Sequence, residues 1–240
     1  QGVIASKVYF NEGRLSRQAI MREIDGTLSR LGTDYLDLYI IHRFDYDTPI
    51  EETMEALHDL VKAGKVRALG ASAMYGYQFY NMQLAARDNG WTPFSAMENH
   101  YNLLYREDER ELIPICKQMK VSLMPYSPLA AGHLARPQWK SESLRGTTDR
   151  VAMGKYDKTE AEDMQIVKRV AELAEKYNCK MSQIAIAWQW AKGILSPIIG
   201  ATKTQYLDDS AGAFDIKLTA EDLAYLEEPY VPHEIVGAIP

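Results

Sequence analysis

Lysine and histidine side chains capable of acid–base chemistry lie at the ends of two short apolar segments of the sequence. Lys7 lies near the end of the segment Val3–Val8, and His42 ends the segment Leu36–His42. A lysine at the edge of an apolar region must be paired or lose hydration, so it often has a charge function. Taken singly, Lys7 is also compatible with a surface lysine that extends into solvent, and His42 with a hydrogen-bonded core histidine. Two such residues at the ends of successive strands favour a shared site.

Two further segments have the chemistry to bind an aromatic ring or an anion. Tyr126, at the end of another apolar segment, offers a flat face that would stack on a ring cofactor, although a tyrosine in this position is more often a core residue. The turn Gly200–Lys203 leads into a helical pattern, so it offers exposed N–H groups, the positive end of a helix dipole and a lysine. In β/α barrels the loops after the last two strands commonly bind phosphate.

Strand-like and helix-like segments that would position these residues alternate along the whole chain. Ser16 is a plausible N-cap for the first helix, and Gly64 suits the left-handed position after the second. The expected strands are Val3–Val8, Leu36–His42, Val66–Ser72, Phe94–Asn99, Val121–Tyr126 and Pro197–Ala201. The expected helices are Arg17–Leu31, one from Pro49 to Ala63, and then about Tyr77–Asn89, Asp108–Met119, Lys158–Tyr177, Ser182–Lys192, Lys203–Ala213 and Ala220–Glu228.

This alternation implies parallel strands joined by helical crossovers, either in an open doubly wound sheet or in a closed barrel. A doubly wound dinucleotide-binding sheet would carry GxGxxG after a strand, and Gly70, Gly76 and Gly132 do not match that spacing. A closed barrel has eight strands, and six would leave two buried-type edges unpaired. The sequence therefore predicts an α/β fold, a (β/α)8 TIM barrel of which residues 1–240 supply six of the eight βα units as a single domain.

The start of the chain within a strand-like segment leads to a further expectation. Two βα units and a capping hairpin, about 70 to 90 residues, are expected to precede Gln1 in the whole polypeptide. A short connection before the first helix also leads us to expect a break in the chain between about Phe10 and Gly13.

Composition excludes several classes of partner. The net charge of −6 argues against nucleic acid, which requires a clustered basic surface. No apolar run approaches the roughly 18 residues that a membrane span requires. Cys116 and Cys179 are far apart and lack metal-ligand spacing, so we expect two packed thiols, no metal and a cytoplasmic protein. The oligomeric state cannot be read from the sequence.

Three runs of residues together resemble the aldo-keto reductase family. They are LGTDYLDLYIIHRFDYDTPIEETMEALHDLVKAGKVRALGAS, YSPLAAGHLAR and PIIGATK, and they fall in order at barrel-consistent spacing. The stretch HYNLLYRE is similar to the bacterial and fungal branch that is related to potassium-channel β subunits. The family uses an Asp, a Tyr, a Lys and a His. Lys7 and His42 match the last two, whereas the Asp and Tyr belong to a segment that this sequence does not contain.

The resemblance implies reduction of an aldehyde or ketone to an alcohol with NADP(H). Lys7 would lower the pKa of the proton-donating tyrosine, and His42 would orient the carbonyl oxygen. Glu98 stands where the family usually has a Gln that binds the nicotinamide carboxamide. Lys203, with Arg136 and Arg145, is expected to meet the 2′-phosphate of NADP(H). The full set of implied cofactor-binding residues is Ser72, Glu98, Tyr126, Ser127, Leu129, Ala130, Gly132, Gly200, Thr202, Lys203, Asp209 and Ser210.

Two other functions remain open at this point. The first is a regulatory subunit that binds NADP(H) and senses redox state while docked on a partner, as the resemblance to channel β subunits allows. The second is a barrel lyase or isomerase that uses Lys7 to form a Schiff base. His42 favours turnover of a small carbonyl substrate over sensing. The residues that would select the substrate are not readable.

Overall fold

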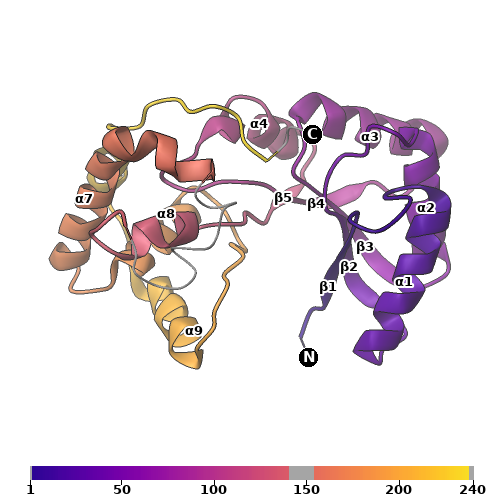
Figure 1. The fold of residues 1–240 in the computed structure, drawn as a ribbon, viewed down its shortest axis with the longest axis horizontal. Helices are drawn as coiled ribbons and strands as arrows, with labels where there is room; N and C mark the ends of the chain where they lie inside the picture. The colour runs from indigo at the N-terminus through magenta and orange to yellow at the C-terminus, as the bar shows by residue number, and fades with distance from the viewer. Residues whose placement is uncertain (1, 141–153, 238–240) are drawn as a thin grey trace. The chain divides into compact units, whose positions relative to one another are not determined.

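The computed structural model describes residues 2–140 and 154–237 (Figure 1). Its contacts divide the chain into two compact units. Unit 1 consists of Gln1–Asn99, Glu109–Leu123 and Gly237–Pro240, and unit 2 consists of His100–Asp108 and Met124–Val236.

Unit 1 is a parallel sheet with helices packed against one face (Figure 1). The sheet has five strands in the order β1-β2-β3-β4-β5, each paired in parallel with the next. These strands are β1 (Ala5–Val8), β2 (Leu36–Ile41), β3 (Val66–Ser72), β4 (Phe94–Glu98) and β5 (Ser122–Leu123). The helices that connect them are α1 (Arg17–Leu31), α2 (Ile50–Lys62), α3 (Gly76–Asn89) and α4 (Leu112–Gln118).

The pleat of this sheet divides its side chains between two faces. One face packs on the helices, and its apolar side chains form one core with side chains of α1 to α4. The sheet residues of this core include Tyr39, Ile41, Leu69, Ala71 and Met97. Successive residues point to opposite faces. Lys7 pairs in register with Ile40, Ile40 with Gly70, and Gly70 with Ala96, so these four residues form one row on the other face. We call this the inner face.

Local capping explains the bounds of α1, which match the predicted helix. The side chain of Ser16 accepts a hydrogen bond from the Ala19 backbone N–H at 3.3 Å. Gly32 ends the helix with φ 64°, a left-handed conformation that glycine adopts without a steric penalty. Ile20 and Ile24, on the apolar side of the helix, are fully buried.

Replacing Ser16 with alanine should lower the free energy of unfolding by about 1 kcal/mol, because the first turn of α1 loses its side-chain acceptor. Urea titration measures this loss. Ser29→Ala is the matched control, because Ser29 is exposed within the same helix and alanine favours helix there. Equal stability of the two variants would contradict the capping role.

The predicted strand Pro197–Ala201 is wrong. The structure has no strand there, and the Ile198 N–H donates a single backbone hydrogen bond, to the Pro125 carbonyl at 2.8 Å. A strand requires a ladder of such bonds with a neighbour. The predicted strand Val121–Tyr126 is likewise reduced to β5, followed by an isolated bridge between His100 and Tyr126, because Pro125 has no N–H to donate.

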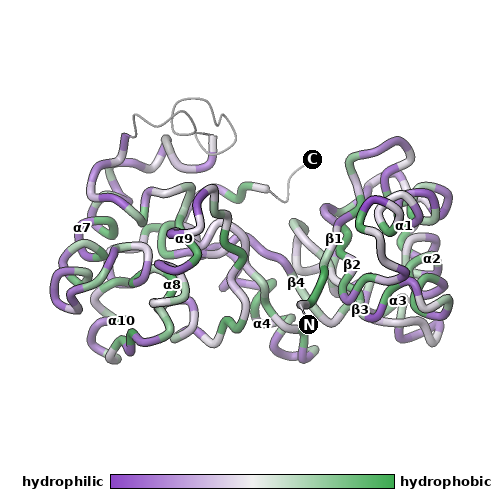
Figure 2. Tube along the Cα trace, turned by 90° about the horizontal axis from the view of Figure 1, so that it is seen from below, coloured by the Kyte–Doolittle hydropathy of each residue, from purple (hydrophilic) through white to green (hydrophobic). Residues whose placement is uncertain are grey.

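Unit 2 is mainly helical. Its α-helices are α7 (Glu160–Lys176), α8 (Met181–Ala191), α9 (Thr204–Ala211) and α10 (Ala220–Glu227), and Figure 2 shows their apolar stretches. Short 3₁₀ helices are η2 (Ala130–Ala135), η3 (Asp157–Thr159) and η4 (Gly212–Asp215), and η1 (Glu107–Glu109) lies where the units meet in sequence. Trp188 is fully buried, packs at a tilt against Tyr101, and donates its Nε1–H to Glu227 at 2.8 Å.

The segment after α10 is held to unit 2 by a buried charged contact. His233 Nε2 lies 3.0 Å from Asp163 Oδ1 on α7, and the two side chains are 5% and 1% exposed. The backbone N–H of His233 donates to Glu107 at 2.9 Å, and Thr159 donates its hydroxyl to Asp163 at 2.6 Å. The hydrogen bond that His233 donates to the Asp163 carboxylate raises the pKa of His233, although burial opposes the rise.

Candidate functional site

Lys7 and His42 lie at the carboxyl ends of the adjacent strands β1 and β2. The His42 backbone N–H donates to the Val8 carbonyl at 2.9 Å, which continues the ladder between the two strands. Burial lowers the pKa of the His42 imidazole, and the positive charge of Lys7 lowers it further. The structure therefore favours a neutral His42 beside a lysine, which suits an imidazole that donates a hydrogen bond to a carbonyl oxygen.

Lys7 forms an ion pair with Glu98, the last residue of β4. Lys7 Nζ lies 3.0 Å from Glu98 Oε2, and the Glu98 side chain is only 6% exposed. Strands β2 and β3 lie between β1 and β4. In a flat sheet, three strand spacings would separate the two backbones by about 14 Å. Side chains stand roughly perpendicular to a flat sheet and would not meet across that distance, so the sheet curves toward its inner face.

Ser72 lies beside Glu98 and is bound to the same strand end. The two residues are in register across β3 and β4. Ser72 Oγ donates a hydrogen bond to the Glu98 backbone carbonyl at 2.8 Å, and Ser72 is 1% exposed. Unit 1 therefore gathers four of the predicted site residues at the carboxyl ends of its strands: Lys7, His42, Ser72 and Glu98.

The ring of Tyr126 in unit 2 is held by aromatic and cationic neighbours. It stacks on His100 with ring centroids 5.1 Å apart and an angle of 9° between the planes. Lys155 Nζ lies 4.6 Å from the Tyr126 ring centroid. His100 is itself held by Tyr156, whose hydroxyl lies 2.7 Å from Nε2, and burial lowers the pKa of this histidine far below its ordinary value. A neutral imidazole thus supports the tyrosine ring.

The predicted phosphate-binding segment has an unusual backbone. Ser127, Ala130 and Ala131 have φ of 57°, 47° and 55°, which costs non-glycine residues about 1–3 kcal/mol each. Backbone that mixes right- and left-handed conformations turns successive N–H groups toward one side, and such turns bind anions. Leu129, with φ −99° and ψ 12°, precedes this run, and Gly132 continues it with φ 96°.

A guanidinium lies against this turn. A Cβ on Gly132 would lie 2.7 Å from Arg136 Nη1, so the guanidinium lies directly against this glycine. Arg136 Nη2 donates to the Trp139 carbonyl at 2.9 Å, while Arg136 Nε is buried without a hydrogen-bond acceptor. The segment therefore fits a bound phosphate, because it combines a strained anion-type turn with a guanidinium that retains donor capacity.

The residues predicted for the adenosine end differ in their surroundings. Gly200, Thr202 and Lys203 are exposed just before α9. Asp209 forms an ion pair with Lys180 at 2.6 Å, and Ser210 donates its hydroxyl to the Tyr206 carbonyl at 2.7 Å. The ion pair offsets the negative charge that an acid would bring near a phosphate. Arg145 lies outside the described residues.

Sequence reasoning missed His100, Tyr156 and Lys155 as the residues that support Tyr126. His100 lies within the quoted run HYNLLYRE, but neither its burial nor its stack on Tyr126 follows from spacing. The contact brings together segments that are distant in sequence, through the bridge between His100 and Tyr126.

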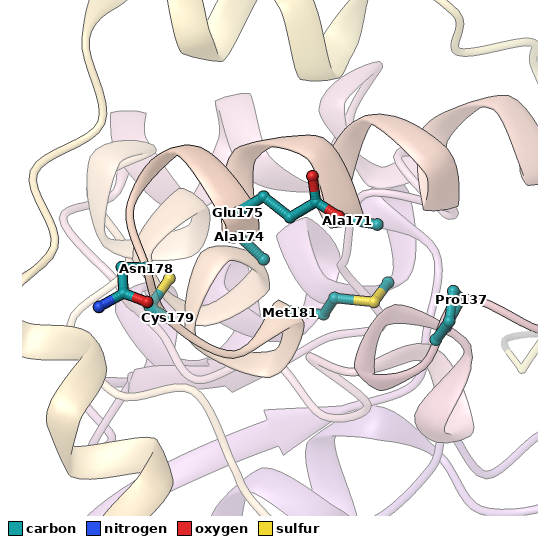
Figure 3. Close-up of a pocket in the computed structure, with 7 residues that line it drawn as sticks. All are labelled: Pro137, Ala171, Ala174, Glu175, Asn178, Cys179 and Met181. Carbon is teal, nitrogen blue, oxygen red and sulfur yellow. The ribbon is translucent and has the colours of Figure 1, made fainter.

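A shallow pocket of about 370 Å³ in unit 2 lies apart from these residues. Figure 3 shows that it is lined by side chains of α7, the turn that follows it, Met181 at the start of α8, and Pro137. None of the predicted site residues lines it.

Cys116 is buried and Cys179 is partly exposed, and both are free thiols. Among the described residues, no group of three or more His, Cys, Asp or Glu side chains is arranged to hold a metal ion. Within the same part of the chain, no helix is long and apolar enough to cross a membrane.

Comparison with known proteins identifies the family. The model of the aldo/keto reductase family matches residues 1–230. The chain is 47% identical over 97% of its length to an aldo-keto reductase of Fusarium vanettenii, covering 62% of that protein. It is 44% identical over 95% of its length to the versiconal hemiacetal acetate reductase of Aspergillus parasiticus, covering 66% of that protein. A putative aryl-alcohol dehydrogenase of Schizosaccharomyces pombe is 45% identical over 95% of the chain, which covers 64% of it.

A solved structure is also similar. It is a thermostable aldo-keto reductase in complex with the inhibitor epalrestat, and it matches with a TM-score of 0.75 and 26% identity. The match covers 94% of this chain and 70% of that one. The chain spans about three fifths to two thirds of the length of the curated relatives named above. On the extent of the family match and the identity to these relatives, the chain belongs to the aldo/keto reductase family.

Proposed function

We propose that the whole protein reduces an aldehyde or ketone to an alcohol with NADPH. The observation that carries this proposal is the placement of Lys7 and a His42 with a lowered pKa at the carboxyl ends of adjacent strands. In β/α barrels the reacting groups lie at these strand ends. Relatives whose names describe a hemiacetal acetate reductase and an aryl-alcohol dehydrogenase support carbonyl–alcohol chemistry.

We further propose that β1 to β5 form part of a closed (β/α)8 barrel within a single domain. Two observations support this. The Lys7–Glu98 ion pair requires curvature toward the inner face, and the structural match extends over 94% of the chain. The strands that would complete the barrel, and the Asp and Tyr of the family, are expected in the segment of the whole protein that this sequence does not contain.

In this mechanism the carbonyl carbon would receive the hydride that NADPH supplies when bound. The neutral His42 donates a hydrogen bond to the carbonyl oxygen and fixes its direction. The Lys7 ammonium stabilises negative charge on the tyrosine that donates the proton. Because both residues lie at strand ends rather than on long loops, their positions are fixed before substrate binds.

Unit 2 carries most of the residues predicted to bind the cofactor. Tyr126, supported from behind by His100, would stack on the nicotinamide. The backbone from Ser127 to Gly132, including Leu129 and Ala130, would bind the pyrophosphate, with Arg136 as its counter-charge. Gly200, Thr202 and Lys203 would contact the adenosine phosphate, and Asp209 and Ser210 the adenine.

NADPH is expected to bind at least about tenfold more tightly than NADH, a difference of about 1.4 kcal/mol. The reason is that Lys203 offers positive charge to the additional dianionic phosphate. Dissociation constants from protein fluorescence, measured with the full-length protein, test this. Lys203→Met should remove most of the preference, whereas Lys217→Met, an exposed lysine of the same unit, should leave it unchanged. Equal affinity for the two cofactors in the wild type would contradict the assignment.

The activity itself is tested by mixing the full-length protein with NADPH and a panel of aldehydes and ketones, and following cofactor absorbance. Turnover supports the reductase. Tight NADPH binding without turnover of any carbonyl would instead favour a redox-sensing subunit. Covalent trapping of a carbonyl compound on Lys7 by borohydride would favour Schiff-base chemistry.

A further inference from the structure

Among the residues that the structure describes, Glu98 is the carboxylate that pairs with Lys7, and it comes from β4, on the far side of the inner face. The two side chains meet at 3.0 Å across β2 and β3. In the row that begins at Lys7 and Ile40, Gly70 adds no side chain and Ala96 adds only a methyl group to the inner face. The ion pair is therefore a property of the curved sheet and not of neighbouring strands.

The two partners differ in how firmly the protein holds them. The Glu98 backbone carbonyl accepts a hydrogen bond from Ser72 Oγ at 2.8 Å and another from the Ala73 N–H at 3.4 Å. The Glu98 side chain is 6% exposed, whereas that of Lys7 is 31% exposed. A lysine side chain has four rotatable bonds and loses up to about 2 kcal/mol of conformational free energy when it is ordered. The protein therefore holds the Glu98 side chain in place, and the Lys7 side chain takes its position from the contact with Glu98.

The electrostatics of the pair also indicate that the two side chains hold each other in place. Burial raises the pKa of the Glu98 carboxyl, and the hydrogen bond and charge of Lys7 oppose that rise. Burial of an unpaired carboxylate is costly, so an ionised Glu98 depends on Lys7 remaining beside it. The same lysine contributes to the lowered pKa of His42. Fixing the ammonium therefore also fixes the field at the histidine.

We propose that Glu98 is a positioning residue that sets the location of the Lys7 ammonium in the active site. The inference rests on the proposed function, because it assumes that Lys7 acts in carbonyl reduction. It differs from the role that the family resemblance implies for this position, where an amide side chain binds the cofactor. Glu98 acts through Lys7. A cofactor carboxamide would meet a carboxylate that is already paired with Lys7.

Glu98→Gln separates these two roles, because glutamine keeps the size and an acceptor oxygen but removes the charge. If Glu98 positions Lys7, this change should lower kcat by at least about tenfold, since misplacement of a catalytic group by about 1 Å can cost up to about 100-fold. The dissociation constant for NADPH should stay within about twofold. Glu98→Asp keeps the charge and should retain more of kcat than Glu98→Gln. The control is Glu55→Gln, which removes a carboxylate from an exposed ion pair with Arg17 on the helix side of unit 1.

Two results would overturn the proposal. One is a Glu98→Gln protein with unchanged kcat and several-fold tighter NADPH binding, as expected of a carboxamide ligand alone. The other comes from a double-mutant cycle in urea with Lys7→Met and Glu98→Gln. The double variant should lose less of its urea midpoint than the sum of the two single losses, because neither charge is left unpaired. Additive losses would mean that the pair does not form. The cycle does not require turnover, so it tests the ion pair even if the proposed reductase activity fails.

Discussion

Replacing Lys7 with methionine in the full-length protein should lower kcat by about 100-fold or more. Methionine keeps the length and much of the packing of lysine but cannot carry the charge that assists proton donation, and positioned acid–base groups contribute about 10²–10⁴-fold. NADPH affinity should change little, because the ammonium acts on the reacting groups. Steady-state rates with NADPH and an aldehyde, together with cofactor titration, measure both quantities.

The matched control is Lys65→Met, which removes a partly exposed lysine that pairs with Asp25 in the same unit. It should retain wild-type kcat. Because Lys7→Met leaves Glu98 without its partner, the unfolding of each variant should be recorded in the same buffers. A folded Lys7→Met protein that keeps more than about a tenth of wild-type turnover would show that the catalytic assignment is wrong.

The second large effect is expected at the Asp163–His233 contact. Asp163→Asn should lower the free energy of unfolding by about 3 kcal/mol near pH 6, because loss of one member of a buried charged pair leaves the other unpaired. Thr159 keeps an acceptor in the asparagine, so the change isolates the contact with the histidine. Urea unfolding followed by tryptophan fluorescence measures the loss.

The pH dependence of this difference follows from the raised pKa of His233. A group whose pKa is higher in the folded state stabilises the fold fully below its unfolded pKa, about 6.5 for histidine, and loses that contribution as pH rises through the folded value. The free energy of unfolding of the wild type should therefore exceed that of Asp163→Asn by the largest amount near pH 6 and by the smallest near pH 9. Asp208→Ala, an exposed acid on α9, serves as the control. A stability difference that did not change with pH would exclude a charged His233.

Local signals were sufficient for the parts of the fold that depend on neighbouring residues. The helix Arg17–Leu31 and the strand Val66–Ser72 have the predicted bounds, because capping, apolar periodicity and turn residues are encoded within each segment. The strand expected at Pro197–Ala201 is absent from the described structure, because a strand also needs a neighbour, which a local pattern does not specify.

In the candidate site, too, local features were predictable from the sequence and contacts between distant segments were not. The expected ends of the strands were enough to predict that four side chains lie at one edge of the sheet, because parallel strands share one carboxyl edge. They are Lys7, His42, Ser72 and Glu98. The ion pair between Lys7 and Glu98 was not predicted, because it depends on how strongly the sheet curves. Nor was the stack of His100 on Tyr126, for which two segments distant in sequence must meet.

Gly70 on β3 is a position of the inner face where the neighbouring strands leave little space for a side chain. A Cβ at Gly70 would lie 3.0 Å from Ile40 Cγ1 and 3.5 Å from the Ala96 carbonyl. Any larger side chain would crowd Ile40 and the backbone of β4, although it would be an ordinary strand former. At this position the close approach of the neighbouring strands, rather than strand propensity, sets the largest residue that the chain can accommodate.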